Sequence, residues 1–274
     1  MDSINKHIEK NEKATLLFAE NTASLEANFY RYIEEYVNMF ETQKGFLVSG
    51  DANVEKLAAL QKEIEKTLGK VGYDKVLGDL LKNLDDINEF WIQFHLDENE
   101  IVVKPIPLTK VQEAYAAMTV QGAGIKGIAN GLQPILHRAL INNITLGTSL
   151  TETLKQVKQS IVSGETTSQT TRYITTATRD VLFQYDGAVN ETIAKAYGLD
   201  GWKYVGSVVD KTRPQCKRWL KMGTIAGDEL AKEIKWAKEN GSGLNPDTTP
   251  TNFGVYRGGY GCRHSAYPVR LKKQ

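Results

Sequence analysis

The stretch YITTATRDVLFQYDGAVNETIAKAYGLDGWKYVGSVVD, residues 173–210, decides the fold of this chain. Its first part repeats small and apolar residues at steps of three and four, which is the period of an amphipathic helix. Gly198 is the expected end of that helix. Beyond it, aromatic and aliphatic residues alternate over 202–209 and predict a strand with two useful faces. The stretch therefore marks a change from long helices to a mixed α+β arrangement near residue 200.

The helical period also dominates the sequence before this stretch. Residues 1–45 are predicted to form one long helix that ends at Gly45, and apolar stripes over 54–68 and 76–94 predict two more helices that pack with it. Helical patterns resume over 132–144. They continue over 149–164, where Ser149 and Glu152 form a capping box.

The sequence after residue 200 predicts a small α+β module. A short helix over 214–222 is followed by Gly223, and an amphipathic helix is expected over 227–240. A loop rich in Gly, Asn, Pro and Thr leads to a closing strand over 262–270, which we expect beside the first strand. The predicted fold class is mainly α, with a long-helix bundle followed by this module.

The prolines of KPIPLT, residues 104–109, predict a stiff connector, and Thr109 with Gln112 matches a capping box that opens the next helix. We therefore divide the chain into an acidic helical region over 1–103, a helical domain over 104–199 and a basic α+β module over 200–274. The first region offers helices that could dock on a partner.

Charge supports this division. Lys and Arg number 11 against 20 Asp and Glu in residues 1–100, 9 against 6 in 101–199, and 14 against 7 in 200–274. A basic end can contact nucleic acid, although solvated helix faces explain such asymmetry equally well. No apolar run is long enough to predict a membrane span, and the polar N-terminus does not match a signal peptide. We expect synthesis in a cytoplasm, where thiols stay reduced.

Gly122, Gly124 and Gly127 have the GxGxxG spacing of a dinucleotide-binding turn. The context differs, because a helical pattern precedes the glycines where a strand is required, and Glu152 is the acid nearest to the expected ribose-binding position. A turn between helices is the ordinary interpretation.

The two cysteines lie in the module, Cys216 within KTRPQC and Cys262 within GGYGCRH. Cys216, Cys262 and His264 could supply three ligands to a tetrahedral zinc, with a water, Asp210 or another group as the fourth. Cys262 and His264 would share one face of the closing strand. Two packed free thiols and a disulfide are the alternatives.

The remaining polar residues of the module have structural interpretations. The carboxylate of Asp210 could accept backbone N–H bonds at 212–213 and cap the helix that Pro214 begins. Arg213 and Arg263 could pair with Asp210 or with Asp180. His7, His95 and His137 lie in helical patterns, which favours surface positions or core positions with hydrogen-bond partners.

The module resembles the C-terminal region of the minor head protein family of tailed bacteriophages, also called the head morphogenesis or Mu F-like family. The matching residues, in chain order, are Asp210, Thr212, Arg213, Pro214, Cys216, Gly223, Cys262, Arg263 and His264. Thr178, Arg179 and Asp180 are the nearest counterparts of the family's upstream helix motif. The resemblance covers roughly residues 110–270. Arg213 replaces a cysteine of many relatives, and Gly259 stands where a histidine is usual.

This resemblance implies a structural minor head protein, a virion component made in the host bacterial cytoplasm and incorporated through the portal or neck as part of a symmetric assembly. Portal, head or neck proteins would be its partners, with contact to packaged DNA and none to a membrane. No enzyme activity is predicted. The alternatives are a nuclease- or toxin-like enzyme that uses His264 as general acid or base, and a zinc-stabilised DNA-binding module.

Overall fold

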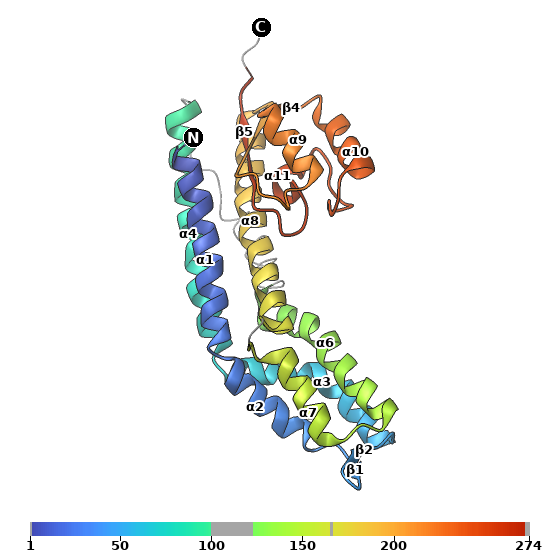
Figure 1. Cartoon of the computed structure of the whole chain (residues 1–274). Coiled ribbons are helices and arrows are strands. Elements are labelled where there is room, and N and C mark those ends of the chain that lie inside the picture. The colour runs from blue at the N-terminus through green and yellow to red at the C-terminus, as the bar shows by residue number, and fades with distance from the viewer. Residues whose placement is uncertain (1, 100–122, 165–166, 272–274) are drawn as a thin grey trace. The chain divides into compact units, whose positions relative to one another are not determined.

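The computed structural model of the chain describes residues 2–99, 123–164 and 167–271 (Figure 1). It confirms the predicted fold class, because the described chain is mostly helical and carries a small antiparallel sheet near its C-terminus. The predicted connector over 104–109, its capping box and Gly122 lie outside the described residues.

The helices account for most of the described chain, and the strands are short. The helices are α1 (Asp2–Ala23), α2 (Glu26–Val37), α3 (Asp51–Lys70), α4 (Tyr73–Asn99), α6 (Ile125–Leu146), α7 (Leu150–Ile161), α8 (Gln169–Tyr197), α9 (Pro214–Met222), α10 (Leu230–Asn240) and α11 (Phe253–Tyr256). The strands are β1 (Thr42–Gln43), β2 (Phe46–Leu47), β3 (Gly201–Val205), β4 (Thr224–Ala226) and β5 (Ser265–Val269). Among the described residues, no helix is both long and apolar enough to span a bilayer.

The described residues form two compact units. Unit 1 comprises 2–14, 81–99 and 179–271, and unit 2 comprises 15–80 and 123–178. Each unit combines segments from distant parts of the sequence. The division along the chain at residues 103 and 199 therefore stays a prediction, since the units are defined by contacts rather than by chain order.

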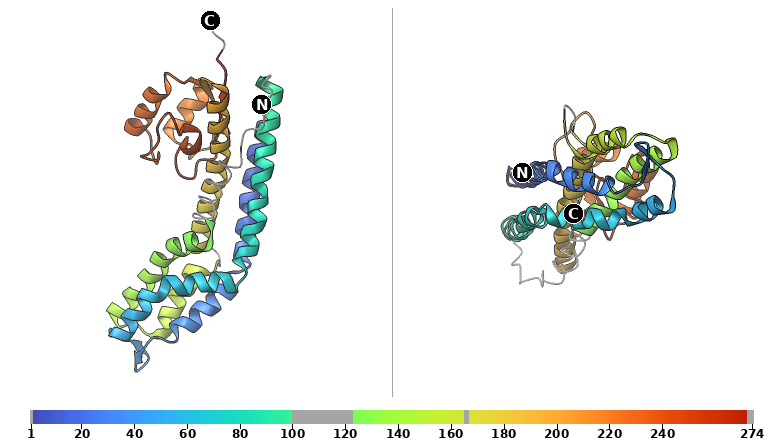
Figure 2. Two further views of the ribbon diagram at one scale, coloured as in Figure 1. Left: turned by 180° about the vertical axis from the view of Figure 1, so that it is seen from behind. Right: turned by 90° about the horizontal axis from the view of Figure 1, so that it is seen from below.

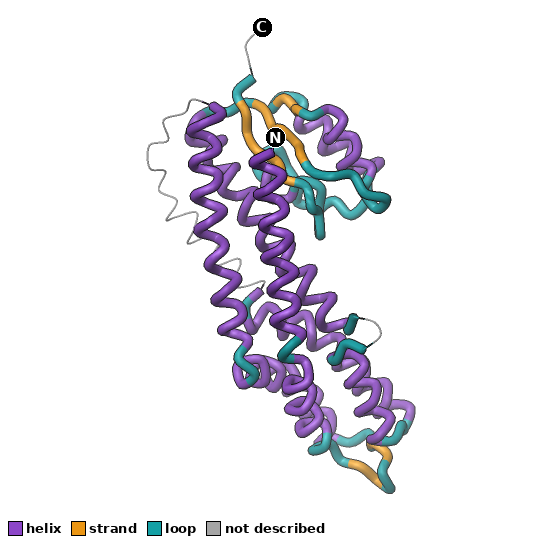
Figure 3. The backbone as a smooth tube through the Cα atoms, turned by 60° about the vertical axis from the view of Figure 1, so that its left-hand side comes forward, coloured by secondary structure: helices purple, strands orange, loops and turns teal. Residues whose placement is uncertain are grey.

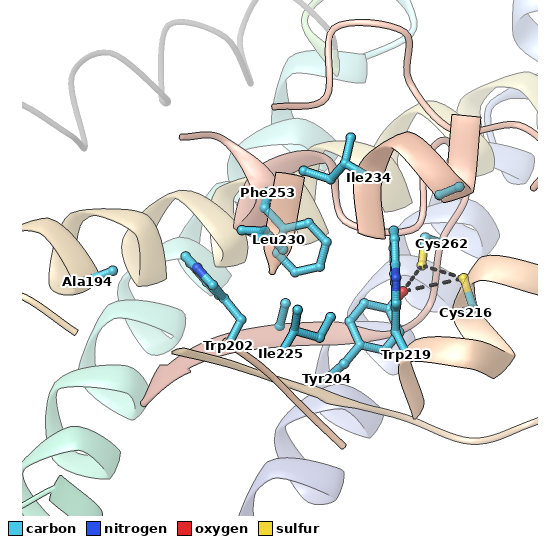
Figure 4. Close-up of a cluster of buried hydrophobic side chains, with 12 residues drawn as sticks. Ala194, Trp202, Tyr204, Cys216, Trp219, Ile225, Leu230, Ile234, Phe253 and Cys262 are labelled. Atoms are coloured by element: carbon cyan, nitrogen blue, oxygen red, sulfur yellow. Dashed lines mark hydrogen bonds between the residues drawn. The ribbon is translucent and has the colours of Figure 1, made fainter. Parts of the chain in front are cut away.

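Unit 1 contains the α+β module, whose strands are drawn in orange near the C-terminus in Figure 3. The strand order of its sheet is β4-β3-β5. Both pairings are antiparallel, and the β3–β5 register runs from Gly201 opposite Val269 to Val205 opposite Ser265. The predicted pairing of the closing strand with the first strand is thus confirmed. Trp202 and Tyr204 project from β3 into a core that α9, α10 and α11 cover, with Trp219 and Phe253 at its centre (Figure 4).

Helical segments complete unit 1 on the other side of the sheet. The first half of α1 lies beside α4 (Figure 2), where the ring of His7 stacks on Phe90 with centroids 3.9 Å apart. Tyr267 of β5 packs against Trp91 and Phe94 of α4, at centroid distances of 5.7 and 5.1 Å. The small sheet therefore buries aromatic side chains on both faces, which accounts for its stability at only three strands.

Unit 2 is a helical bundle in which α2 and α3 pack with α6 and α7. The side chain of Ser149 accepts a hydrogen bond of 3.2 Å from the backbone N–H of Glu152, so the predicted cap of α7 is confirmed. Glu26 has a buried carboxylate that receives hydrogen bonds from the hydroxyls of Ser163, Ser168 and Thr171. These bonds tie the start of α2 to the start of α8.

The predicted single helix over 1–45 is wrong. The helix breaks after Ala23, where the hydroxyls of Thr22 and Ser24 donate to carbonyls of the preceding turn and compete with helical N–H groups. Gly45 does not end a helix but forms the turn of the β1–β2 hairpin, with a φ of +84° that favours glycine.

Other boundaries also differ from prediction. Gly124 precedes α6 and Gly127 lies inside it, so a helix replaces the expected turn there. β3 is shorter than predicted and ends at Val205, because Gly206 adopts a φ of +142° that strands do not use. Gly198 and Gly223 do follow α8 and α9 as predicted. Strand β4 and helix α11 were not predicted.

Candidate metal centre

Three separate segments of unit 1 bring four side chains to one place. Tyr204 lies on β3, Cys216 lies in the first turn of α9, and Cys262 and His264 lie in the segment just before β5. The β3–β5 pairing places Ser265 opposite Val205, so the chain before β5 must run past the end of β3. We call Tyr204, Cys216, Cys262 and His264 the thiol cluster.

The polar atoms of the thiol cluster converge, and Figure 4 shows those of Tyr204, Cys216 and Cys262. The two sulfurs are 4.0 Å apart, and the hydroxyl of Tyr204 lies 3.4 Å from each of them. Nδ1 of His264 lies 3.4 Å from the sulfur of Cys262. The predicted ligand atoms of Cys216, Cys262 and His264 all lie within 4.8 Å of one another. The structure therefore brings these three residues together, and it adds Tyr204.

The thiol cluster is closed to solvent. Cys216 is 2% exposed, and Cys262 and His264 are each 6% exposed. Gly258 covers the cluster, since a Cβ at this residue would lie 2.5 Å from the Cys262 sulfur, 2.6 Å from the Cys216 sulfur and 2.7 Å from the Tyr204 hydroxyl. Glycine is required at residue 258 because any side chain would occupy the space between these atoms.

The orientation of His264 is fixed by its backbone surroundings. Its Nε2 lies 3.2 Å from the carbonyl oxygen of Ser207, which can only accept a hydrogen bond. In the neutral ring this places the proton on Nε2 and leaves the lone pair of Nδ1 directed towards Cys262. Gly206 makes room for the ring, since a Cβ there would lie 2.6 Å from Cδ2 of His264.

The pKa values of the two thiols are shifted in opposite directions. The hydrogen bond between the sulfurs, together with burial, raises the pKa of Cys216, and the same hydrogen bond lowers the pKa of Cys262. The pKa values of the two thiols are thus pushed apart, and loss of both protons is disfavoured without further positive charge. Burial likewise raises the pKa of the Tyr204 phenol, which therefore acts as a hydrogen-bond donor in this state.

Arg213 and Gln215 organise the loop that closes the cluster. The guanidinium of Arg213 donates to the carbonyl of Gly258 at 2.9 Å and to that of Tyr260 at 2.5 Å. Gln215 donates to Ser242 at 2.7 Å and also reaches Gly258. The motif TRPQC therefore holds the loop over 240–261 against α9, in place of the predicted pairing of Arg213 with Asp210 or Asp180.

Asp210 has no place in the thiol cluster and is exposed. The predicted cap of α9 by Asp210 is wrong, because Arg213 is the N-cap residue and α9 has no side-chain cap. The turn before α9 is closed instead by Thr212, whose hydroxyl accepts a 2.8 Å hydrogen bond from the N–H of Val209. The arrangement leaves Asp210 outside the buried structure.

Arg263 and Asp180 do not pair with each other either. Arg263 lies 3.8 Å from the carboxylate of Glu12, and its side chain is mostly exposed. Asp180 on α8 accepts a hydrogen bond from the N–H of Gly261, next to Cys262. Cys262 and His264 lie before β5 rather than inside it as predicted, although both are buried and Arg263 between them is exposed.

A second buried polar cluster in unit 1 was not predicted. Asp186 on α8 accepts hydrogen bonds from His7 at 2.6 Å, from Trp91 at 2.7 Å and from Ser265 at 3.2 Å. We call these four residues the Asp186 network. Burial acts to raise the pKa of Asp186, but the hydrogen bond and charge of His7, with help from Arg257 and Trp91, outweigh it and lower the pKa. His7 is thus a core histidine with a partner.

Sulfur and imidazole ligands favour zinc among the common metal ions, and a buried cluster of Cys216, Cys262 and His264 could hold a metal. Both cysteines are free thiols. Their separation of 4.0 Å is about twice the S–S bond length of ~2.05 Å. Metal ligands and packed thiols are therefore the interpretations that suit this geometry.

Comparisons of the chain with protein-family models, with curated proteins and with solved structures found no match. The resemblance of the two motifs to the minor head family stays a prediction for that reason. The grounds for a functional conclusion are the geometry of the thiol cluster and the residues that carry the resemblance.

Proposed function

We propose that this chain is a structural minor head protein of a tailed bacteriophage, whose C-terminal module is stabilised by zinc bound to Cys216, Cys262 and His264. The observation that supports the proposal is the convergence of KTRPQC and GGYGCRH, the two motifs that carry the resemblance, in one buried cluster. A zinc ion there would cross-link α9 to the segment before β5 and contribute directly to folding.

A structural role suits the thiol cluster better than catalysis. Its ligand atoms are buried beneath Gly258, and both ring nitrogens of His264 lie near partners, at Ser207 and Cys262. A general acid or base must reach the proton that it transfers. The geometry therefore does not favour the nuclease alternative that uses His264.

The test of the proposal is the location of the protein. Particles of the phage that encodes it are purified, and their proteins are identified by mass spectrometry. Affinity-tagged protein is separately co-expressed with the portal protein of the same phage and isolated. We expect the chain in the particles at a small, fixed copy number and in complex with the portal. Its absence from particles together with no portal complex would overturn the proposal.

Contact with DNA is a second candidate function, favoured by the surface of α9. Lys217 and Lys221 are exposed on this helix, and Lys211 is exposed just before it. Lysines on one short segment can neutralise neighbouring phosphates, and such binding weakens steeply with salt. Charge reversal of Lys217 and Lys221 to Glu should abolish DNA binding at low salt. Unchanged DNA affinity in that variant would eliminate this candidate.

A further inference from the structure

We infer that Tyr204 is the fourth ligand of the metal centre, so that a bound zinc would be held by two sulfurs, one imidazole nitrogen and one phenolate oxygen. This inference rests on the zinc site of the proposed function and completes it. The sequence motifs contain no candidate for the fourth position other than Asp210, which the structure leaves exposed.

The spacing of the four polar atoms fits ligation by Tyr204. For tetrahedral zinc, the usual bond lengths imply ligand separations of about 3.8 Å between two sulfurs, and of about 3.5 Å between a sulfur and a nitrogen or an oxygen. The measured separations are 4.0 Å between Cys216 and Cys262, 3.4 Å from each of them to Tyr204, and 3.4 Å from Cys262 to His264. These four separations agree with the tetrahedral values to within ~0.2 Å, whereas the ligand atoms of Cys216 and His264, up to 4.8 Å apart, would have to approach by about 1 Å.

The phenol oxygen of Tyr204 also converges with the two sulfurs. A single point, the Cβ position that Gly258 leaves empty, lies within 2.7 Å of Tyr204 Oη and of both sulfurs. Gly258 closes one side of this triangle of atoms. The ring of His264 stacks on that of Tyr204, with centroids 5.5 Å apart and planes at 27°. Nδ1 of His264 lies close to the sulfur of Cys262.

Competing oxygen ligands are engaged elsewhere. The carbonyl of Gly258 accepts hydrogen bonds from Arg213 and Gln215. The carbonyl of Ser207 accepts from His264. The hydroxyl of Tyr204 is directed at the two sulfurs, and a metal bond would replace these weak hydrogen bonds.

Nearby arginines would offset the charge of the metal-bound centre. Binding of Zn²⁺ displaces one proton from each thiol and one from the phenol, which leaves the centre with a net charge of about −1. Arg213 acts electrostatically on Cys216, and Arg257 acts on Cys262. Arg257 is itself buried, at 3% exposure. Two guanidinium groups therefore stand near a centre that becomes anionic when the metal binds.

The test is an ultraviolet difference spectrum of the full chain, recorded as Zn²⁺ is added to protein stripped of metal by a chelator under reducing conditions. Ligation by Tyr204 ionises one of the 12 tyrosines, so we expect the absorption band of one tyrosinate per zinc bound. Tyr204→Phe should lack this band and bind zinc at least about tenfold more weakly. Tyr260→Phe, which alters an exposed tyrosine of the loop over 240–261, should match the native chain.

Zinc binding without a tyrosinate band would overturn the inference and leave the zinc site intact, with Tyr204 a hydrogen-bond donor to thiolates. No zinc binding by the native chain would overturn both the inference and the zinc site. Neither result bears on incorporation into virions, which the particle analysis measures separately. Because the spectrum is recorded on the native chain, the result does not depend on whether Tyr204→Phe folds.

Discussion

The thiol cluster and the Asp186 network are two buried polar clusters of unit 1, and they are built in opposite ways. In the Asp186 network the contacts are 2.6–3.2 Å, and N–H or O–H groups of His7, Trp91 and Ser265 occupy both carboxylate oxygens. In the thiol cluster the contacts are 3.4–4.0 Å. The first set of distances fits a completed hydrogen-bond network, and the second fits both weak hydrogen bonds to the larger sulfur atoms and the spacing of ligands around an ion.

This difference separates the two clusters chemically. The Asp186 network is complete with protein groups alone, so a chelator should not affect it. In the thiol cluster the hydrogen bond between the sulfurs raises the pKa of Cys216 and lowers that of Cys262, so loss of both protons is disfavoured without added positive charge. With the proposed zinc bound there, a chelator should lower the stability of unit 1.

The largest expected effect comes from removal of the central carboxylate. Asp186→Ala leaves His7, Trp91 and Ser265 buried without their acceptor, and we expect the free energy of unfolding to fall by about 3–5 kcal/mol. Denaturant unfolding measures the loss. Asp85→Ala, which removes an exposed carboxylate of α4, is the matched control and should change stability by less than about 0.5 kcal/mol. Equal effects of the two substitutions would refute the assigned role of the network.

The sequence could predict one of these clusters but not the other. Cys216, Cys262 and His264 stand out by residue type, and the strand pattern before and after them implies that the two motifs meet. The partners of Asp186 are ordinary residues 79 to 179 positions away in the chain. Nothing in the local pattern of His7 or Ser265 indicates their meeting, because such contacts depend on how long helices pack.

Tyr204 and Gly258 show an intermediate case. The alternation of residues from Trp202 on predicted a strand with two useful faces, but not that the phenol of Tyr204 would meet the two sulfurs. Gly258 belongs to a glycine-rich loop, and the turns of such a loop are enough to explain a glycine there, so the sequence does not reveal that Gly258 covers the thiol cluster. Similarly, helix periodicity predicted α3, α4 and α9 well, whereas the break after Ala23 depends on side-chain hydroxyls that periodicity does not detect.

A methyl group at Gly258 would enter the thiol cluster directly. Gly258→Ala places a Cβ within 2.7 Å of three polar atoms, and we expect a loss of about 1–3 kcal/mol together with weakened zinc binding. Zinc titration and denaturant unfolding measure the two effects. Gly78→Ala adds a methyl in open space on α4 and should be neutral or slightly stabilising. If Gly258→Ala kept native zinc affinity, the space beneath Gly258 would not be needed by the centre.

Glu191 introduces a pH dependence in unit 1 that is independent of both clusters. Burial raises its pKa from 4.5 to about 7, while its carboxylate accepts a hydrogen bond from Gly254. Because the folded-state pKa lies above the unfolded value, stability falls as the pH rises from about 4.5 to about 7 and then stays level. Glu191→Gln should remove this decline, a relative gain on the order of 1–2 kcal/mol above pH 7.

Unfolding of the native chain and of Glu191→Gln at a series of pH values measures that difference. Parallel stability curves for the two proteins would show that the carboxylate titrates normally in the folded state. Glu239→Gln, on the exposed face of α10, controls for the loss of one charge.

The smallest expected effect on stability comes from substitution of Arg263, the arginine of GGYGCRH. Arg263→Ala removes an exposed pairing with Glu12 and should cost less than about 0.5 kcal/mol. Arg213→Ala removes hydrogen bonds to two carbonyls of the closing loop and should cost about 1–2 kcal/mol. Thermal unfolding of both variants compares them. A larger loss for Arg263 than for Arg213 would reverse the roles assigned to these residues.

Metal content tests the central claim most directly. The full chain is purified under reducing conditions and analysed for bound elements, beside a Cys216→Ser, Cys262→Ser double variant. We predict about one zinc per native chain, none in the double variant, and a lower unfolding temperature for the native chain after chelation. A native chain that carries no zinc, takes none up and is unaffected by a chelator would contradict the account and leave the two cysteines as packed thiols.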